Sequence, residues 1–344
     1  MRHTIHATIV LTVLAAPALA WNAHGHRLIT YLALSGLPAD APAWLKDAQL
    51  HNRAAFQANE CDRWRGWRAN PLRHVNEPNH YIDIDKLDQF GLTLNSLPKL
   101  RREYVRALAV AKYLHPEKVE PYDATKDPAA VSEWPGFLPY AITEHYAALQ
   151  ASFNQVRILE QINDPKRSFQ LEQSRANAIY HMGLLSHFVG DAAQPLHTTK
   201  HHHGWVGKNP AGYTTDRGFH SRIDGKVLEH HHLTFATVLP HVKFDRKINA
   251  ADPWDDVLAH IQRSFDKMEP LYKLERDGEL NGEAGKRFIT ERLSDGASML
   301  SAMIWAAYTS AEPTSEQVEK WQRYNNFKPE LFPGAAAVST GVSK

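Results

Sequence analysis

Cysteine is almost absent from this chain of 344 residues, which contains only Cys61. A single cysteine excludes any disulfide within the chain, so the fold must depend on a packed core. Apolar residues make up 43% of the sequence and charged residues 22%, a composition that supplies such a core and excludes a disordered chain. An excess of one charge is also lacking, because 39 lysines and arginines stand against 38 aspartates and glutamates. Bulk charge therefore does not attract polyanions, and any nucleic acid must be recognised locally.

A continuous apolar segment long enough to span a membrane is missing after residue 20. The residues before it carry one formal charge, at Arg2, followed by an apolar run and the small-residue sequence Ala18-Leu19-Ala20. This order is typical of a secretory signal peptide, and an uncleaved anchor is the alternative. We therefore expect a signal peptide over 1–20, cleavage between Ala20 and Trp21, and a secreted or periplasmic protein without stable membrane insertion.

Alternating strand patterns are scarce, and only the short stretch 81–84 is ambiguous. Apolar residues instead recur every three or four positions, as in amphipathic helices. No internal repeat or shift of composition divides the chain, so we expect one all-α domain over 21–312 and a polar tail over 313–344. Prolines mark a long loop over 116–135. The expected helices include one that begins near His26 and others at 97–114, 137–162, 168–189, 254–268 and 283–308.

Histidine, in contrast, is abundant, with 21 residues in the chain. His187 and Asp191 are four positions apart on an expected helix, so both side chains leave the same face. Pro195 ends that helix, and the following turn is expected to bring His197 back toward His187 and Asp191. Imidazole and carboxylate groups in this arrangement suit zinc. His220 and Asp224 repeat the spacing of four, and two such pairs favour a metal site over chance pairs on a solvated helix.

The combined pattern resembles the secreted trinuclear-zinc phosphodiesterases, which comprise single-strand-specific nucleases and zinc-dependent phospholipases C. That family begins its mature chain with Trp, as Trp21 would after cleavage, and His26 stands where the nucleases have a histidine. Asp62, Arg65 and His80 fit the next conserved pattern of the nucleases. The string from His187 to His197 matches the most specific motif of the family, and the resemblance extends in ordered pieces from Trp21 to Asp224.

The resemblance implies a single helical domain of the zinc phospholipase C and single-strand nuclease type, with extra helices within 86–165. It also implies three zinc ions. The first would be held by Asp62, His80, His187 and Asp191. The second would be held by the amine and carbonyl of Trp21, by His26 and by Asp191, which bridges the two ions. The third would be held by His197, His220 and Asp224.

The same resemblance assigns catalysis to Asp62, Arg65 and Asp191, with Arg65 neutralising charge on the phosphoryl oxygens. Tyr81 and Asp83 occupy the positions at which the nucleases bind a base, although a buried tyrosine and a helix cap are equally good interpretations. The run His201-His202-His203 replaces a glycine-rich stretch of the nucleases, and its role stays open.

We therefore expect a zinc-dependent hydrolase of phosphodiester bonds, first of all an endonuclease that cleaves single-stranded nucleic acid and leaves 5′-phosphates. The first alternative is a phospholipase C that acts on a phospholipid headgroup, because the sequence around His220 is closer to that branch. The second alternative is a zinc-binding protein without catalytic activity.

Overall fold

The computed structural model describes residues 21–326. The expected signal peptide at 1–20 lies outside the described residues, as does the end of the polar tail. Within 21–326 the chain forms helices and no β-strand, and the only β-type pairing there is an isolated bridge between Ile82 and Gly136. The expectation of an all-α fold is confirmed.

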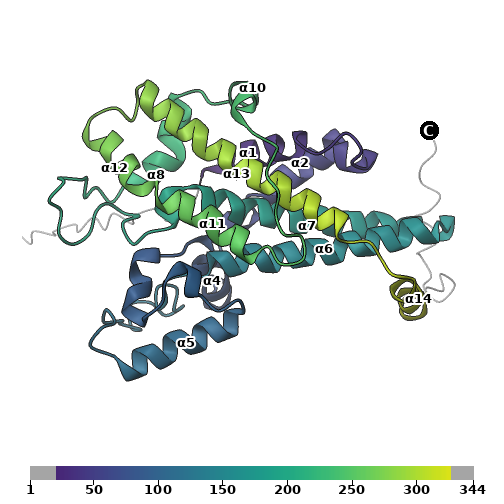
Figure 1. The fold of residues 1–344 in the computed structure, drawn as a ribbon, viewed down its shortest axis with the longest axis horizontal. Coiled ribbons are helices and arrows are strands. Elements are labelled where there is room, and N and C mark those ends of the chain that lie inside the picture. The colour runs from purple at the N-terminus through teal and green to yellow at the C-terminus, as the bar shows by residue number, and fades with distance from the viewer. Residues whose placement is uncertain (1–20, 327–344) are drawn as a thin grey trace, which may run out of the picture.

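Two long helices, α6 (Leu138–Ile162) and α7 (Ser168–Ala193), form an antiparallel pair through the centre of the protein (Figure 1). They are joined by a short connection in which Asn163 adopts the left-handed conformation that ends α6. Residues 182–193 of α7 are buried without exception. Because this half of α7 is enclosed on all sides, its polar side chains must find partners inside the protein.

Four helices surround the buried half of α7: α1 (Ala23–Ser35), α2 (Ala48–Gln57), α11 (Trp254–Phe265) and α13 (Glu283–Thr309). The side chain of Asn22 caps α1 by accepting hydrogen bonds from the backbone amides of His24 and Gly25. This cap fixes where the helix starts and thereby the position of His26 in its first turn.

Shorter helices complete the fold. They are α3 (Glu60–Trp64), α4 (Asn70–Asn76), α5 (Arg101–Leu114), α8 (Phe219–Ser221), α9 (Leu228–His230), α10 (Phe235–Val238), α12 (Met268–Arg276) and α14 (Ser315–Tyr324). Single turns of 3-10 type connect several of them, among them η2 (Glu77–His80), η3 (Ile84–Phe90) and η6 (Pro195–His197). A π-helical turn, η7 (Arg222–Val227), joins α8 to α9.

The expected long helices are present with shifted ends. The helix expected from residue 97 begins at Arg101, because Leu97 precedes Pro98 and both Leu97 and Leu100 are extended. The helix expected over 254–268 is α11, which ends at Phe265, and a further helix, α12, begins at Met268. The polar tail contains α14, which begins at a capping box formed by Thr314 and Gln317. None of the described helices combines the length and apolar character that crossing a membrane requires.

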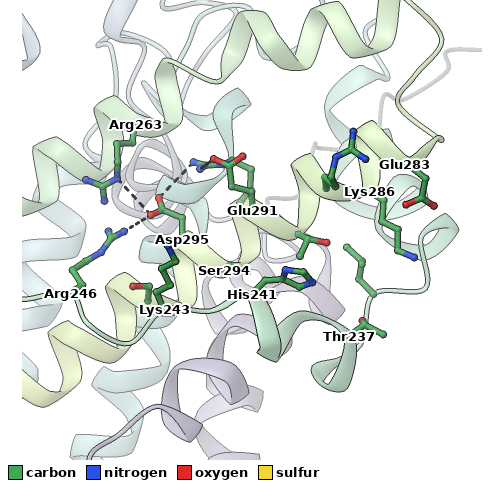
Figure 2. A pocket seen from close by; sticks show the side chains of 15 residues that line it. Thr237, His241, Lys243, Arg246, Arg263, Glu283, Lys286, Glu291, Ser294 and Asp295 are labelled. Atoms are coloured by element: carbon green, nitrogen blue, oxygen red, sulfur yellow. Dashed lines mark hydrogen bonds and ion pairs between the residues drawn. The ribbon is translucent and has the colours of Figure 1, made fainter.

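A cavity of about 660 Å³ lies between α11, α13 and the segment 233–246 (Figure 2). Its walls carry side chains of residues 233–246, of Arg263 and of residues 283–298. We call it the basic cavity. It is separate from a smaller cavity of about 310 Å³ beside the clustered histidines, which we call the histidine cavity.

Candidate metal centre

Helix α7 supplies the two central side chains of the site, His187 and Asp191, one turn apart on the same face. Both are fully buried, and Nε2 of His187 lies 3.4 Å from Oδ2 of Asp191. Gly190 permits His26 to approach, because a Cβ atom at Gly190 would lie 3.0 Å from Nδ1 of His26. His26 thus reaches Asp191 from α1, with its Nε2 3.4 Å from Oδ1.

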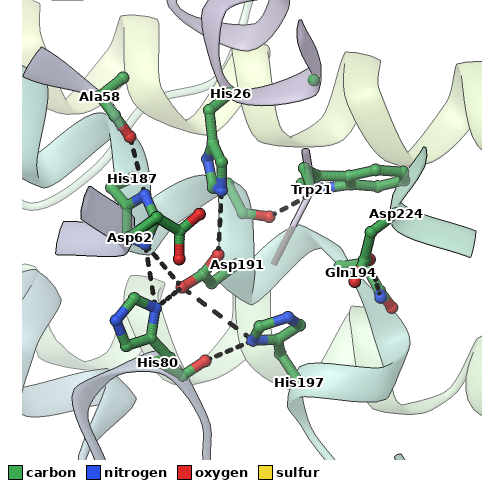
Figure 3. A network of polar contacts seen from close by, with 12 residues as sticks. Trp21, His26, Ala58, Asp62, His80, His187, Asp191, Gln194, His197 and Asp224 are labelled. Atoms are coloured by element: carbon green, nitrogen blue, oxygen red, sulfur yellow. Dashed lines mark hydrogen bonds and ion pairs between the residues drawn. The ribbon is translucent and has the colours of Figure 1, made fainter. Parts of the chain in front are cut away.

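Trp21 and Asp62 also lie near this part of α7. The indole of Trp21 is fully buried and donates a hydrogen bond of 3.0 Å to the carbonyl of Gly190, the residue before Asp191 (Figure 3). Asp62, on α3, offers a carboxylate oxygen that forms a possible metal-binding group with His26 and His187. Of the ligands predicted for the second metal site, His26 lies beside Asp191, and the Trp21 side chain contacts the residue before Asp191. Asp62, predicted for the first site, groups with His26 as well as with His187.

Backbone pairing brings His80 and His197 to the other side of Asp191. The amide of Ile82 donates to the carbonyl of His197 at 2.9 Å, and the amide of Ile84 donates to that of Thr198 at 3.1 Å. His80 thereby comes to lie with its Nδ1 3.1 Å from Oδ2 of Asp191. Pro195 begins the turn η6, which carries His197 beyond the end of α7.

His220 and Asp224 are the third pair, and they lie on the segment made of α8, η7 and α9. Nε2 of His220 is 3.2 Å from Oδ2 of Asp224, and both side chains are buried. The carboxylate belongs to the π-helical turn η7, a rare conformation that is common at functional sites. The backbone amide of Asn22 donates to the carbonyl of Asp224 at 3.0 Å, which joins this segment to the start of α1.

The spacing of these atoms fits metal coordination. Around a tetrahedral zinc ion with bonds of about 2.0–2.1 Å, neighbouring ligand atoms are about 3.3–3.4 Å apart. The distances from Asp191 to His26 and to His187, and from Asp224 to His220, are all 3.2–3.4 Å. Three groups have ligand atoms within 4.8 Å of one another: His26, Asp62 and His187; His80, His187 and Asp191; and His197, His220 and Asp224. These buried clusters can hold metal ions.

Hydrogen bonds outside the clusters fix the orientation of several ligand residues. His187 donates from Nδ1 to the carbonyl of Ala58 at 2.7 Å, and His197 donates from Nδ1 to the carbonyl of His80 at 2.5 Å. Each ring then keeps the lone pair of Nε2 directed toward the cluster. Gln194 donates to Oδ1 of Asp224 at 2.7 Å, whereas Oδ2 has no hydrogen-bond partner among the described residues. Second partners of this kind orient metal ligands in proteins.

Burial also sets the protonation of these groups. Burial and the neighbouring histidines hold the pKa of His26, His80 and His220 well below the usual value of a histidine. These rings are therefore neutral and able to bind a cation. Burial and the nearby Asp62 raise the pKa of Asp191 well above its usual value, and burial does the same for Asp224. Several carboxylates in one buried site require compensating positive charge, which divalent cations would supply.

The histidine cavity opens beside this centre. Its walls include His80, His197 and His220, so a molecule inside it would touch the clusters. Arg65 also lines it, and its Nη1 lies 3.5 Å from Oδ1 of Asp62. The cavity thus combines an arginine with the candidate metal ligands.

Tyr81 and Asp83 lie in the wall of the histidine cavity. The hydroxyl of Tyr81 donates to the carbonyl of Val131 at 2.7 Å, so the phenol is anchored. Asp83 is buried, and its carboxylate lies 3.1 Å from Nζ of Lys86 and 3.8 Å from Nδ1 of His202. Burial raises the pKa of Asp83, and the charges of His202 and Lys86 oppose that rise.

The long segment between His80 and His187 builds one wall of the histidine cavity. Val131, Ser132 and Trp134, at the end of the proline-marked loop, line it. The amide of Asp83 donates to the carbonyl of Pro135 at 2.6 Å, and the amide of Leu138 donates to that of Tyr81 at 3.1 Å. The loop is thereby joined to the segment that carries the candidate substrate-binding residues.

The three consecutive histidines, 201–203, have different surroundings in the fold. His201 is buried, and its ring stacks on Trp205 with centroids 4.0 Å apart, so it stabilises the loop. His202 and His203 line the histidine cavity, and the ring centroid of His203 is 5.8 Å from that of His220. Burial lowers the pKa of His203 to about 4.

With this geometry described, the chain was compared with known proteins. No protein-family model matches it, and no curated protein is similar to it. The resemblance to the trinuclear-zinc phosphodiesterases therefore remains a prediction from the motif residues, and the site must be interpreted from its own geometry.

Sequence patterns missed three kinds of contributor to the site. Gln194 lies inside the motif string, but only the fold shows that its amide orients Asp224. The carbonyl of Ala58 holds His187, and no sequence signal marks a backbone group of this kind. Trp134 and Val131 reach the histidine cavity from a loop whose composition indicates nothing beyond irregular structure.

Proposed function

We propose that the protein is a secreted zinc-dependent phosphodiesterase that cleaves single-stranded nucleic acid and leaves 5′-phosphate ends. The observation that carries this proposal is the convergence of three buried histidine–aspartate clusters beside a cavity that also contains Arg65. Three zinc ions are the cofactors that we propose, because neutral imidazoles and carboxylates are the donors that zinc prefers.

Different residues of the chain would hold the three ions. Asp191 would bridge two ions, since its two oxygens face different histidines, His26 on one side and His80 and His187 on the other. His197, His220 and Asp224 would hold the third ion. Zinc bound at these positions supplies Lewis acidity and lowers the pKa of water, which suits hydrolysis of a phosphodiester.

Arg65 would bind the phosphate itself. Its side chain is 15% exposed and lines the histidine cavity, and its Nε has no hydrogen-bond partner among the described residues. The guanidinium can donate to the two non-bridging phosphate oxygens and neutralise the charge that develops on them. Asp62 holds this guanidinium beside the clusters, which explains why both residues belong to the site.

The wall of the histidine cavity offers groups that suit a nucleotide base. Tyr81 presents a ring that is anchored through its hydroxyl, and Asp83 offers an oxygen without a hydrogen-bond partner among residues 21–326. A ring stacks on a base and a carboxylate accepts hydrogen bonds from a base edge. A choline headgroup can also bind an aromatic ring and a carboxylate, so the comparison of substrates below decides between a nucleotide and a phospholipid.

A direct test compares substrates on the zinc-loaded protein that begins at Trp21. Single-stranded DNA, double-stranded DNA, phosphatidylcholine and bis(p-nitrophenyl) phosphate would be assayed side by side, and the ends of the DNA products would be identified. We expect single-stranded DNA to be cleaved fastest, with 5′-phosphate products. Faster cleavage of phosphatidylcholine would replace the nuclease by a phospholipase C.

Two matched variants distinguish hydrolysis by this protein from hydrolysis by a contaminating enzyme. Asp62→Asn should lower cleavage of every substrate by at least about a hundredfold, in line with the loss of an electrostatic catalytic group. Asp88→Asn changes an exposed carboxylate on η3 and should leave the rates unchanged. Full zinc content without hydrolysis of any phosphodiester would instead favour a zinc-binding protein without catalytic activity.

A further inference from the structure

The basic cavity shares no lining residue with the histidine cavity. Its volume of about 660 Å³ is also more than twice as large. Six basic and three acidic side chains line it, whereas charges nearly balance over the whole chain. The basic residues are Lys243, Arg246, Arg263, Lys286, Arg287 and Arg292. A local surplus of positive charge in a concave surface concentrates anions.

Three arginines in this cavity share one carboxylate, that of Asp295 (Figure 2). Arg246 forms a direct ion pair with it. Nε of Arg263 and Nη1 of Arg292 are each 3.6 Å from one of its oxygens, which is beyond hydrogen-bond distance. One carboxylate therefore cannot satisfy the three guanidinium groups.

The lack of hydrogen-bond acceptors is clearest at Arg292. Its side chain is only 4% exposed, and its Nη2 donates to Glu291 at 2.9 Å. Its Nε and Nη1 have no acceptor among the described residues, and the same holds for Nη1 of Arg246 and Nε of Arg263. Buried donors without acceptors are costly, so a cluster of four of them at one cavity wall calls for an external acceptor.

The donors define the chemistry of that acceptor. Planar guanidinium groups bind the oxygens of phosphate in pairs, and the six basic against three acidic side chains of the wall leave a surplus of positive charge that suits a dianion. The cavity is much larger than one phosphate group, and Lys243 and Lys286 extend the positive charge along it. We propose that the basic cavity binds a dianionic phosphate group, either as orthophosphate or as the terminal phosphate of a monoester.

Two contacts connect this cavity with the rest of the fold. Nη2 of Arg263 lies 3.3 Å from Nδ1 of His260, and Nε2 of His260 lies 3.2 Å from the carbonyl oxygen of Val189 on α7. Arg263 is therefore connected to the core through His260. The phosphate site stands on residues different from those of the proposed catalytic centre, so either proposal can fail without the other.

The test is a calorimetric titration of the zinc-loaded protein with orthophosphate and, separately, with AMP, at constant ionic strength in chloride. Arg263→Gln removes a partly exposed guanidinium and should weaken binding roughly tenfold, as expected for the loss of a charged hydrogen bond. Asp295→Asn removes the competing carboxylate and should tighten binding. Both orthophosphate and AMP should bind, and the tighter of the two identifies the source of the phosphate group.

A control separates this site from the metal centre, where phosphate can also bind. Asp224→Asn alters the metal centre and should leave the component that depends on Arg263 unchanged. Equal titrations of the parent and Arg263→Gln would overturn the proposal, and so would complete loss of binding in Asp224→Asn. Circular dichroism establishes that each variant is folded, and Arg263→Gln alone decides the question if Asp295→Asn does not fold.

Discussion

The substitution Asp191→Asn should stabilise the protein without metal and destabilise it when zinc is present. The Asp191 carboxylate is fully buried, and its Oδ1 has no hydrogen-bond partner in the described part of the chain. Burial and the neighbouring Asp62 raise its pKa. The charged form therefore opposes folding of the metal-free protein at pH 7, above the usual pKa of the group. An amide of the same shape should increase the free energy of unfolding in EDTA by about 1–3 kcal/mol.

Zinc reverses this expectation because the carboxylate then becomes a ligand shared by two sites. Each site occupied at a hundredfold excess over its dissociation constant contributes about 2.7 kcal/mol to the free energy of unfolding. If Asp191→Asn empties both sites, the variant forfeits about 5 kcal/mol of zinc stabilisation. Because the variant is about 1–3 kcal/mol more stable without metal, it should be about 2–4 kcal/mol less stable than the parent in zinc. Urea unfolding at pH 7, with EDTA and with excess zinc, measures both differences.

Asp295→Asn is the matched control. Asp295 is also mostly buried, but its hydrogen bond with His260 and the charges of Arg246 and Arg292 outweigh its burial and hold its pKa below the usual value. The stabilisation from this carboxylate is present at pH 7 and is lost as the pH falls toward that depressed pKa. The variant should therefore lose about 3 kcal/mol equally in EDTA and in zinc. If Asp191→Asn behaved like this control, Asp191 would be a structural ion-pair partner and the reasoning would be refuted.

Three further results follow from the site. Retention of residues before Trp21 should reduce zinc content and activity, because the free α-amine of Trp21 is a predicted ligand; full zinc content and activity in the uncleaved chain would contradict this. Gln194→Ala should weaken zinc binding about 10–100-fold by releasing Asp224, measured by competition with a chelator, and unchanged affinity would exclude an orienting role. Tyr81→Ala should slow cleavage of single-stranded DNA about tenfold while sparing bis(p-nitrophenyl) phosphate, and Tyr81→Phe should retain the ring and the rate; equal losses on both substrates would argue against base stacking.

Local patterns predicted those parts of the structure that depend on neighbours in sequence. The spacing of four between His187 and Asp191 is a property of any helix, so the shared face of these side chains followed directly. Apolar periodicity identified α6, α7 and α13 for the same reason. The π-helical turn that carries Asp224 could not be predicted, because its conformation depends on packing against the start of α1.

Contacts between segments that are distant in sequence could not be predicted from sequence patterns. Asp62 and Arg65 were proposed from a resemblance, since no spacing relates α3 to α7. The loop that carries Trp134 reaches the histidine cavity through backbone bonds to residues 78–83, which depend only on tertiary structure. The three arginines around Asp295 stand at positions 246, 263 and 292, too far apart in sequence to suggest a common site.

The most direct test of the metal centre is anomalous X-ray diffraction at the zinc absorption edge, on crystals of the protein that begins at Trp21. We expect three peaks in the anomalous difference map: one beside His80 and His187, one beside His26, and one between His220 and Asp224. Crystals soaked in a chelator should lose all three peaks. Anomalous density at none of these positions in zinc-loaded crystals would contradict the account.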